Sequence, residues 1–475
     1  MQTRNIFRNL SPLDHRYWEA NDTLFEDLAD YLSEEAQVRY CARAEAALIK
    51  AHLAMRGKAD DTVFAAVDAA AETLDPEAVY AEEATTRHNI RALVNVLQRG
   101  LPPEIAPLVH LGATSVDIID TAQAARLRDV SLRVVLPLLA RVLSELSRIA
   151  REEADTPQVG RTHGQHAVPI TFGFAIAEYA SRLGKCLPEM EARAKDLRGK
   201  LAGATGSYNA LSMSYADPRA MEKCYLDNLG LSPSEHSTQL VEPEYLLHLL
   251  LEMNTAFGVL ANLADDLRNL QRSEIDEIRE RFGSGQVGSS TMPQKRNPWN
   301  SEHVKSLWKA FAPRVMSFFM DQISEHQRDL TNSASGRFMA DYVAGFCAAA
   351  NRTLSVLSSL TVNREKMLAN LQSGGAVLAE PAYILLAENG LADAHEIIRT
   401  ITLAAEKDSL TFGQALAANP VAKTAVYSQL RVLGHTDPAA FFAAPEKYNG
   451  LAAEKAREIA VRYAAVAARY ISDQA

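Results

Sequence analysis

The chain has 475 residues, of which 47% are apolar, and its formal net charge is -10. It is therefore too long for one ordinary hydrophobic core, too apolar for a disordered protein and too acidic for general nucleic-acid binding. Arg141 and Glu145 interrupt the best candidate for a membrane span, and residues 1–10 contain no apolar signal core. We expect two or three domains in a soluble, cytoplasmic protein that does not enter a membrane.

The cysteines show neither metal-ligand nor redox spacing. They lie far apart in the sequence, at Cys41, Cys186, Cys224 and Cys347. We therefore expect buried thiols in a reducing compartment, and no metal site built on them.

Helical patterning begins near the N-terminus and continues to the end of the chain. Alanine and leucine are abundant, and no run of alternating β-branched residues predicts a strand. Residues 18–110 are typical of several medium helices, with a break at Pro102 and Pro103. A long helix is expected from Asp117 to about Ala154, kinked at Pro137.

Residues 155–168 are expected to form a connector, followed by a helix that begins at Pro169 and ends near Lys200. The helix over residues 240–273 carries an apolar seam typical of lengthwise packing in a bundle, although an ordinary core helix fits it too. The seam is spaced alternately four and three apart: Leu246, Leu250, Met253, Phe257, Leu260, Ala264 and Leu267. Further helices are expected over residues 300–327 and 338–360.

Turn-forming glycines and prolines return after residue 363, so the segments there are shorter. We predict an all-α fold of three helical domains. These are an N-terminal domain over 1–113, a central long-helix bundle over 114–363 and a C-terminal domain over 364–475.

Residues 288–298 read as a loop, because glycines precede this stretch and two prolines interrupt any helix through it. The loop carries two hydroxyls, Ser289 and Ser290, together with Lys295 and Asn297. Polar groups on a loop held by a rigid scaffold are frequently functional, while the alternative is a plain surface connector.

The stretch GSSTMPQKRNP at 288–298, followed by Glu302, resembles the signature of the fumarase/aspartase superfamily. Within that superfamily, the run GRTHGQHAVP at 160–169 is similar to the THGQ motif of the adenylosuccinate lyases. Three further pieces also resemble this family: SPLDHRY at 11–17, TTRHN at 85–89, and RDLTNS at 328–333 followed by Arg337. Arginine and serine donors together suit a phosphate group.

The resemblance implies β-elimination of fumarate from adenylosuccinate, giving AMP, and from the related ribotide SAICAR, giving AICAR. Ser289 is then the base and His163 the acid, Glu302 orients His163, and Lys295 helps to stabilise charge. No metal or organic cofactor is required. The resemblance also implies substrate contacts from Arg16, Tyr17, His88, Asn89, Thr114, Ser115, Thr162, Gln239, Ser290, Asn297, Arg328, Ser333 and Arg337.

Two departures from the family pattern keep a paralogous lyase open as an alternative. Asn89 stands where the family has an aspartate, and Gln294 is more typical of argininosuccinate lyases. Such a paralogue would eliminate fumarate, or a relative of it, from another succinyl-type compound. A helical scaffold without catalysis is a third alternative, against which the intact Ser289, Lys295 and His163 argue.

The expected site is shared between chains. Thr114 and Ser115 precede a helix that is roughly 55 Å long, and His163 lies beyond its far end. Gln239 and Ser289 flank the helix over 240–273 in the same way. Groups at opposite ends of a bundle converge only if antiparallel copies pack together. The resemblance points to a homotetramer with each site built from three subunits.

Overall fold

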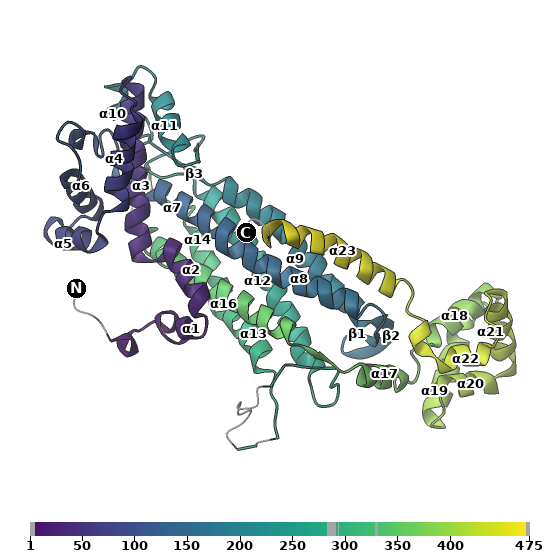
Figure 1. The fold of residues 1–475 in the computed structure, drawn as a ribbon. Helices are drawn as coiled ribbons and strands as arrows, with labels where there is room; N and C mark the ends of the chain where they lie inside the picture. Colours follow the sequence, from purple (N-terminus) through teal and green to yellow (C-terminus); the bar gives the residue numbers. More distant parts are fainter. Residues whose placement is uncertain (1–4, 283–290, 293, 328–330, 472–475) are drawn as a thin grey trace.

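The computed structural model describes residues 5–282, 291–292, 294–327 and 331–471, and helices dominate it (Figure 1). Strands within these residues form three short sheets of two strands each. The predicted all-α fold is therefore confirmed. The cysteines are free: Cys41, Cys186 and Cys347 are buried, while Cys224 is partly exposed.

The N-terminal region is a group of short and medium helices around one longer helix, α3 (Glu34–Met55). Aspartates cap α4 and α5, where Asp60 and Asp75 accept hydrogen bonds from the first backbone amides. The other elements here are 3-10 turns at Ile6–Arg8, Pro12–Asp14 and Ala106–Leu108, and helices α1 (Arg16–Glu19), α2 (Asp22–Leu32), α4 (Asp61–Glu72), α5 (Pro76–Thr86) and α6 (Asn89–Arg99).

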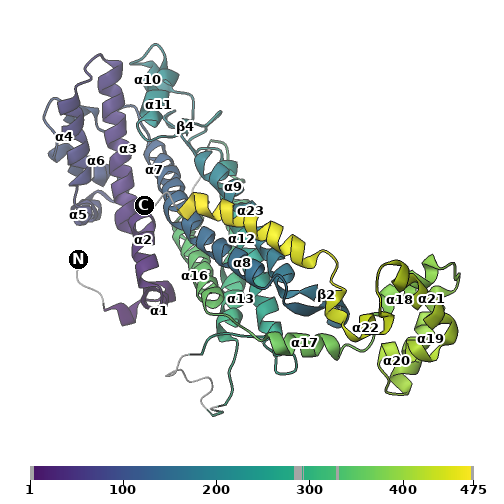
Figure 2. The same cartoon turned by 45° about the vertical axis from the view of Figure 1, so that its right-hand side comes forward.

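Long helices lying side by side form the bundle (Figures 1 and 2). They are α7 (Ser115–Val130), α8 (Leu136–Glu152), α9 (Phe172–Lys195), α12 (Pro243–Leu270), α13 (Trp299–Phe311) and α16 (Met339–Ser358). A π-helical turn over Ser131–Val135 joins α7 to α8. Pro137 lies in the first turn of α8 and has no backbone amide to donate to the preceding turn. The wider π turn lies directly before it, where that hydrogen bond is missing. The expected long helix is thus continuous.

The structure differs from the expected helices at two places, and each lies at a proline. The connector over 155–168 contains a β-hairpin, β1 (Pro157–Thr162) and β2 (Gln165–Thr171), in which Pro169 pairs with Val159 and α9 begins only at Phe172. The helix expected over 300–327 stops at Phe311, because Pro313 lies in a 3-10 turn, Ala312–Arg314. It is followed by α14 (Val315–Met320) and α15 (Ser333–Arg337).

Short elements connect the bundle helices. They are β3 (Arg198–Gly199), α10 (Asn209–Ser212), α11 (Pro218–Asp227), β4 (Ser232–Pro233), β5 (Ile278–Arg279), β6 (Thr361–Val362) and α17 (Arg364–Gln372). The pair β3–β4 is parallel and the pair β5–β6 is antiparallel.

A separate C-terminal lobe has its own hydrophobic cluster, whereas the N-terminal helices and the bundle share one continuous core. The lobe contains α18 (Ala379–Glu388), α19 (Ala394–Lys407), α20 (Phe412–Ala418), α21 (Pro420–Val432), α22 (Pro438–Ala443) and a 3-10 turn at Pro445–Lys447.

The two helices that flank the C-terminal lobe pack on the bundle side of the molecule. Helix α17 packs against β1, and the last helix, α23 (Ala452–Ile471), returns to lie along α8 and α9 (Figure 1). The Tyr463 ring of α23 meets the bundle where a glycine gives it room: a Cβ at Gly184 would lie 2.1 Å from that ring.

Helix α12 corrects the expectation that no segment is apolar enough to cross a membrane. By length and composition alone, Pro243–Leu270 passes that test, with a mean hydropathy of 1.3. The helix is the centre of the bundle, however, and 56% of that apolar stretch is buried inside the protein. Its apolar surface is therefore used in packing against α9, α13 and α16.

Candidate active site

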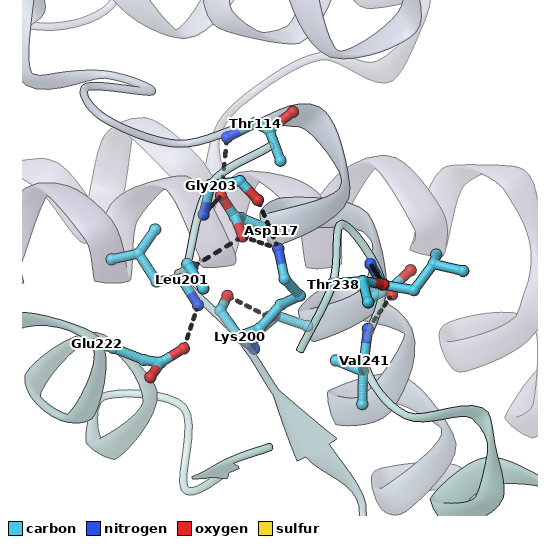
Figure 3. Close-up of polar contacts among 12 residues, drawn as sticks. Thr114, Asp117, Lys200, Leu201, Gly203, Glu222, Thr238 and Val241 are labelled. Atoms are coloured by element: carbon cyan, nitrogen blue, oxygen red, sulfur yellow. Dashed lines mark hydrogen bonds and ion pairs between the residues drawn. The ribbon is translucent and has the colours of Figure 1, made fainter. Parts of the chain in front are cut away.

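The N-terminal end of α7 is organised by one buried carboxylate, Asp117 (Figure 3). It accepts a hydrogen bond of 2.8 Å from the backbone amide of Thr114, as in a capping box at the start of this helix. It also accepts hydrogen bonds of 3.2 Å from the backbone amides of Ala202 and Gly203. Asp117 thus ties the turn that carries Thr114 and Ser115 to the loop that follows β3.

Lys200 supplies the charge that balances Asp117. Its ammonium group forms an ion pair with the Asp117 carboxylate, and both side chains are 0% exposed. The same ammonium donates to the carbonyl oxygen of Gly203 at 3.3 Å. The Lys200 backbone amide donates to the Thr121 hydroxyl, and that hydroxyl donates to the Lys200 carbonyl oxygen. A buried pair with its polar atoms satisfied fixes geometry, because leaving either charge alone is costly.

Glu222 holds the other side of this loop. Its carboxylate accepts hydrogen bonds from the Leu201 backbone amide at 2.7 Å and from the Tyr208 hydroxyl at 2.6 Å. Burial raises the pKa of Glu222, against the effect of these two donors. Lys200 and Glu222 were not singled out in the sequence, because they lie in no recognisable pattern.

The segment that carries Gln239 reaches the same end of the bundle. The backbone of Gly206, with φ of +81°, passes so close that a Cβ there would lie 1.9 Å from the carbonyl oxygen of Ser237. Asp120 of α7 accepts a hydrogen bond of 3.0 Å from the Val241 amide. Gln239 is therefore brought to the neighbourhood of Thr114 and Ser115.

A second buried carboxylate supports the residues just before Thr114. Glu45 of α3 is 0% exposed and accepts from the backbone amide of His110 at 2.9 Å, and it lies 2.7 Å from Nδ1 of that imidazole. Hydrogen bonding and the charge of Glu45 raise the pKa of His110, although burial acts in the opposite direction. His110 was not singled out in the sequence, because a histidine five residues before a helix carries no pattern of its own.

His163 lies at the tip of the β1–β2 hairpin. His163 and Gly164 form its two-residue turn, with φ of +53° and +74°, as tight hairpin turns require. The side chains of Thr162 and His163 are exposed. The hairpin therefore presents the predicted acid to solvent, beyond the end of the bundle.

Glu277 anchors the base of this hairpin. It is 0% exposed and pairs with Arg161 at 2.6 Å. It also accepts hydrogen bonds from the amides of Gln158, at 2.8 Å, and Asn370, at 2.9 Å. Burial, and then the charge of Arg161, lower the pKa of His166 next to the turn. The hairpin is thus fixed to the segment that follows α12.

The predicted base lies outside the described residues, as do Ser290 and Arg328. Of the remaining signature, Lys295 is exposed and Asn297 is half-buried just before α13. Glu280 caps α13 by accepting from the backbone amide of Ser301 at 2.9 Å and from its hydroxyl at 2.6 Å. The 277–280 segment therefore joins the hairpin to the signature.

Glu302 is exposed in the first turn of α13. Among the described residues, it makes no hydrogen bond or ion pair with His163. The orienting contact expected between the two is therefore absent within one chain.

Tyr17 approaches α13 from the N-terminal region. Its hydroxyl lies 3.0 Å from Nε2 of His303, and the guanidinium of Arg352 lies 5.2 Å from the ring centre of Trp299. Burial, followed by the charge of Arg352, lowers the pKa of His303. Arg16 is exposed beside Tyr17. The SPLDHRY segment and the signature segment are thus neighbours.

Some of the other predicted substrate contacts line a cavity of about 770 Å³ between the N-terminal helices and the bundle. Asn89, Ser333 and Arg337 are among its lining residues. Nδ1 of His88 accepts a hydrogen bond of 3.2 Å from the Arg91 amide and so caps α6. Asn89 accepts from the Ile90 amide at 2.8 Å, a contact that an aspartate could make equally well.

The structure places the predicted residues in separate groups within one chain. Thr114, Ser115 and Gln239 lie where α7 begins, and the hairpin with His163 lies beyond the far end of α8 (Figure 2). Helices α7 and α8 and the π turn between them cover residues 115–152, roughly 55 Å of helix. A small substrate cannot touch both ends of such a rod.

Comparisons with known proteins identify the family. Residues 15–312 match the family described as Lyase, and residues 324–436 match the family described as Adenylosuccinate lyase C-terminal. An adenylosuccinate lyase of Pyrococcus abyssi is 33% identical over 457 residues, covering 94% of this chain and 96% of its own. The chain belongs to the adenylosuccinate lyase family. The expected membership of this lyase family and of the fumarase/aspartase superfamily is thereby confirmed.

Solved structures agree with the helical architecture of the adenylosuccinate lyase family. The 3-carboxy-cis,cis-muconate lactonizing enzyme of Pseudomonas putida aligns with a TM-score of 0.77 and 25% identity, covering 97% of this chain and all 100% of its own. A fumarate lyase of a Mesorhizobium species has a TM-score of 0.79 and 23% identity, and the alignment covers 93% of this chain and 97% of its own. At this identity the second likeness establishes the fold alone.

Proposed function

We propose that this protein eliminates fumarate from adenylosuccinate, giving AMP, and from SAICAR, giving AICAR. The observation that carries the proposal is the family relationship over almost the whole chain, in which 94% is covered by one adenylosuccinate lyase. The test is to follow purified protein with each substrate by ultraviolet absorbance. Absence of turnover on both, with a folded protein, would contradict the proposal.

The chemistry that we assign to the side chains is serine-base, histidine-acid elimination. Ser289, as its alkoxide, removes the proton next to a carboxylate, and Lys295 and Asn297 stabilise the negative charge that develops. The carbon–nitrogen bond then breaks, and His163 protonates the leaving nitrogen. The exposed, tightly turned position of His163 suits a group that must meet a substrate held elsewhere.

We also propose that the active protein is a homotetramer with each site shared between three chains. The support is the length of the bundle, because Thr114 and His163 lie at opposite ends of roughly 55 Å of helix. In such an assembly, Glu302 would orient the His163 of another copy. A cytoplasmic location, and the absence of nucleic-acid partners, stay predictions from the sequence.

Complementation tests the shared site. Ser289→Ala and His163→Ala should each be inactive alone. Mixed after partial dissociation, they should recover activity, because some sites then combine an intact Ser289 with an intact His163 from different chains. An active monomer in sedimentation, or no recovery from two well-folded variants, would contradict the proposal.

A paralogous lyase for another succinyl compound remains the second candidate, because Asn89 lines the same cavity as Ser333 and Arg337. If Asn89 takes over the role of the aspartate that is usual in the family, Asn89→Asp should keep or raise turnover of adenylosuccinate. Complete loss of turnover would show that the site is adapted to another ligand. Competition by inorganic phosphate against the substrate separates the two candidates further, since only a nucleotide site needs to bind phosphate.

A further inference from the structure

Arg126 is a buried cation without a local partner. The side chain projects from α7, the residue is only 6% exposed, and its Nε atom is buried without a hydrogen-bond partner. Among the described residues, no carboxylate lies within ion-pairing distance of it. Glu34, Tyr40 and Cys41 act on it only through longer-range electrostatics. Burial lowers the pKa of Arg126, yet an arginine stays charged in proteins, so the group cannot avoid this cost by losing its proton.

The guanidinium lines the cavity of about 770 Å³ described above. Around it, α3, α5 and α7 contribute an apolar patch to the wall, with Val38, Cys41, Val79 and Leu127. Gln37 and Gln123 are the amides on the same wall. This end of the cavity therefore places one buried guanidinium beside an apolar patch, on a wall that also carries Glu34, Glu83 and Asp120.

Carboxylates also line the cavity, and four of them are engaged with other partners. Glu34 accepts a hydrogen bond of 3.0 Å from the Tyr80 hydroxyl, and Asp120 accepts from the Val241 amide at 3.0 Å. Glu242 accepts from the Ser234 hydroxyl at 2.6 Å, and Asp341 pairs with Arg314 at 3.0 Å. The lining also includes Asp14, Glu83 and Asp321, and among the described residues none of these carboxylates forms an ion pair with Arg126. The guanidinium is therefore left to pair with an external anion.

We propose that this end of the cavity is a binding site for a small organic monocarboxylate with an apolar body. A planar guanidinium matches a carboxylate geometrically, and the interaction is strong where water is excluded. The apolar wall accommodates the body of the ligand. The site includes none of the side chains to which the elimination chemistry is assigned, although it shares its cavity with the predicted substrate contacts Asn89, Ser333 and Arg337.

Benzoate, a flat monoanion, is a suitable probe, and benzamide is its uncharged counterpart. Calorimetric titration of the full-length protein should show benzoate binding and much weaker benzamide binding. Arg126→Met, which keeps the length of the side chain and removes the charge, should weaken benzoate binding about tenfold or more. Arg126→Lys should bind benzoate with an affinity between those of the parent and of Arg126→Met. The control Arg431→Met, which changes an exposed arginine, should bind benzoate as the parent does.

Thermal unfolding supplies a second measurement, because Arg126→Met removes an uncompensated buried charge. The variant should be at least as stable as the parent, and benzoate should raise the melting temperature of the parent alone. No benzoate binding by the parent, equal binding by Arg126→Met, or equal binding of benzoate and benzamide would each overturn the proposal. None of these readouts uses turnover, so they stand apart from the proposed elimination.

Discussion

Replacing Lys200 with methionine is the sharpest test of the buried pair at the start of α7. The substitution keeps most of the side-chain volume, removes the ammonium group and leaves the Asp117 carboxylate buried, with 0% exposure. Removing one member of a buried pair typically destabilises a protein by about 3–5 kcal/mol. Three backbone amides continue to donate to Asp117, so we expect the lower part of that range, about 3 kcal/mol.

Urea unfolding of the single and double variants measures this cost. Lys200→Met and Asp117→Asn should each destabilise the protein, while the double variant should lose less than the sum, because no uncompensated charge remains. The control is Lys223→Met, which breaks an exposed i,i+4 pair with Asp227 whose side chains are 67% and 58% exposed. That control should cost no more than about 0.5 kcal/mol.

The outcome that refutes this reasoning is equally specific. If Lys200→Met costs as little as Lys223→Met and shows no coupling to Asp117→Asn, the pair contributes no more than a surface ion pair. Lys200→Met could instead be strongly destabilised while the double variant loses the full sum of the two single losses in unfolding free energy. In that case Lys200 acts through packing and its charge is irrelevant.

Three further outcomes are expected. Ser289→Ala should fold and bind substrate but lose several orders of magnitude in turnover, and wild-type-like activity would remove Ser289 from the mechanism. Arg337→Leu should weaken adenylosuccinate binding by about 2 kcal/mol, as for a lost charge-assisted hydrogen bond, and an unchanged Michaelis constant would count against a phosphate contact. Glu222 has a raised pKa in the folded state, so the native protein holds its proton more tightly than the unfolded chain does, and its contribution to stability falls as pH rises from 4.5. Glu222→Gln should therefore flatten the pH dependence of the unfolding free energy above that value, and an unchanged slope would contradict the assignment.

The long helices could be predicted from the sequence because their signal is local and repeated. The apolar seam from Leu246 to Leu267 predicted α12 well, and the long helix expected from Asp117 corresponds to α7 and α8. The hairpin over 157–171 could not be predicted in this way. Its strands are short and contain Gly160, where a Cβ would lie 2.7 Å from the carbonyl oxygen of Val168, so the pattern that identifies a strand is missing.

The candidate site was predictable only as far as its motifs extend. Motifs located His163 and Lys295, because those residues lie in contiguous, recognisable runs. They could not locate Lys200 or Glu277, since each acts on a segment distant in sequence and only the folded chain brings them together. The return of α23 to the bundle was missed for the same reason, because a packing partner leaves no mark in the pattern of one helix.

Both ends of the bundle use one physical device. Asp117 and Glu277 are each fully buried, each neutralised by a single cation, and each bonded to further donors from segments remote in sequence. A rod of continuous helix separates the two, so each end is ordered without reference to the other. Because the ends are ordered independently, their shapes can be matched between copies of the chain rather than within one. The same independence would allow an intact end of one copy to compensate for a damaged end of another.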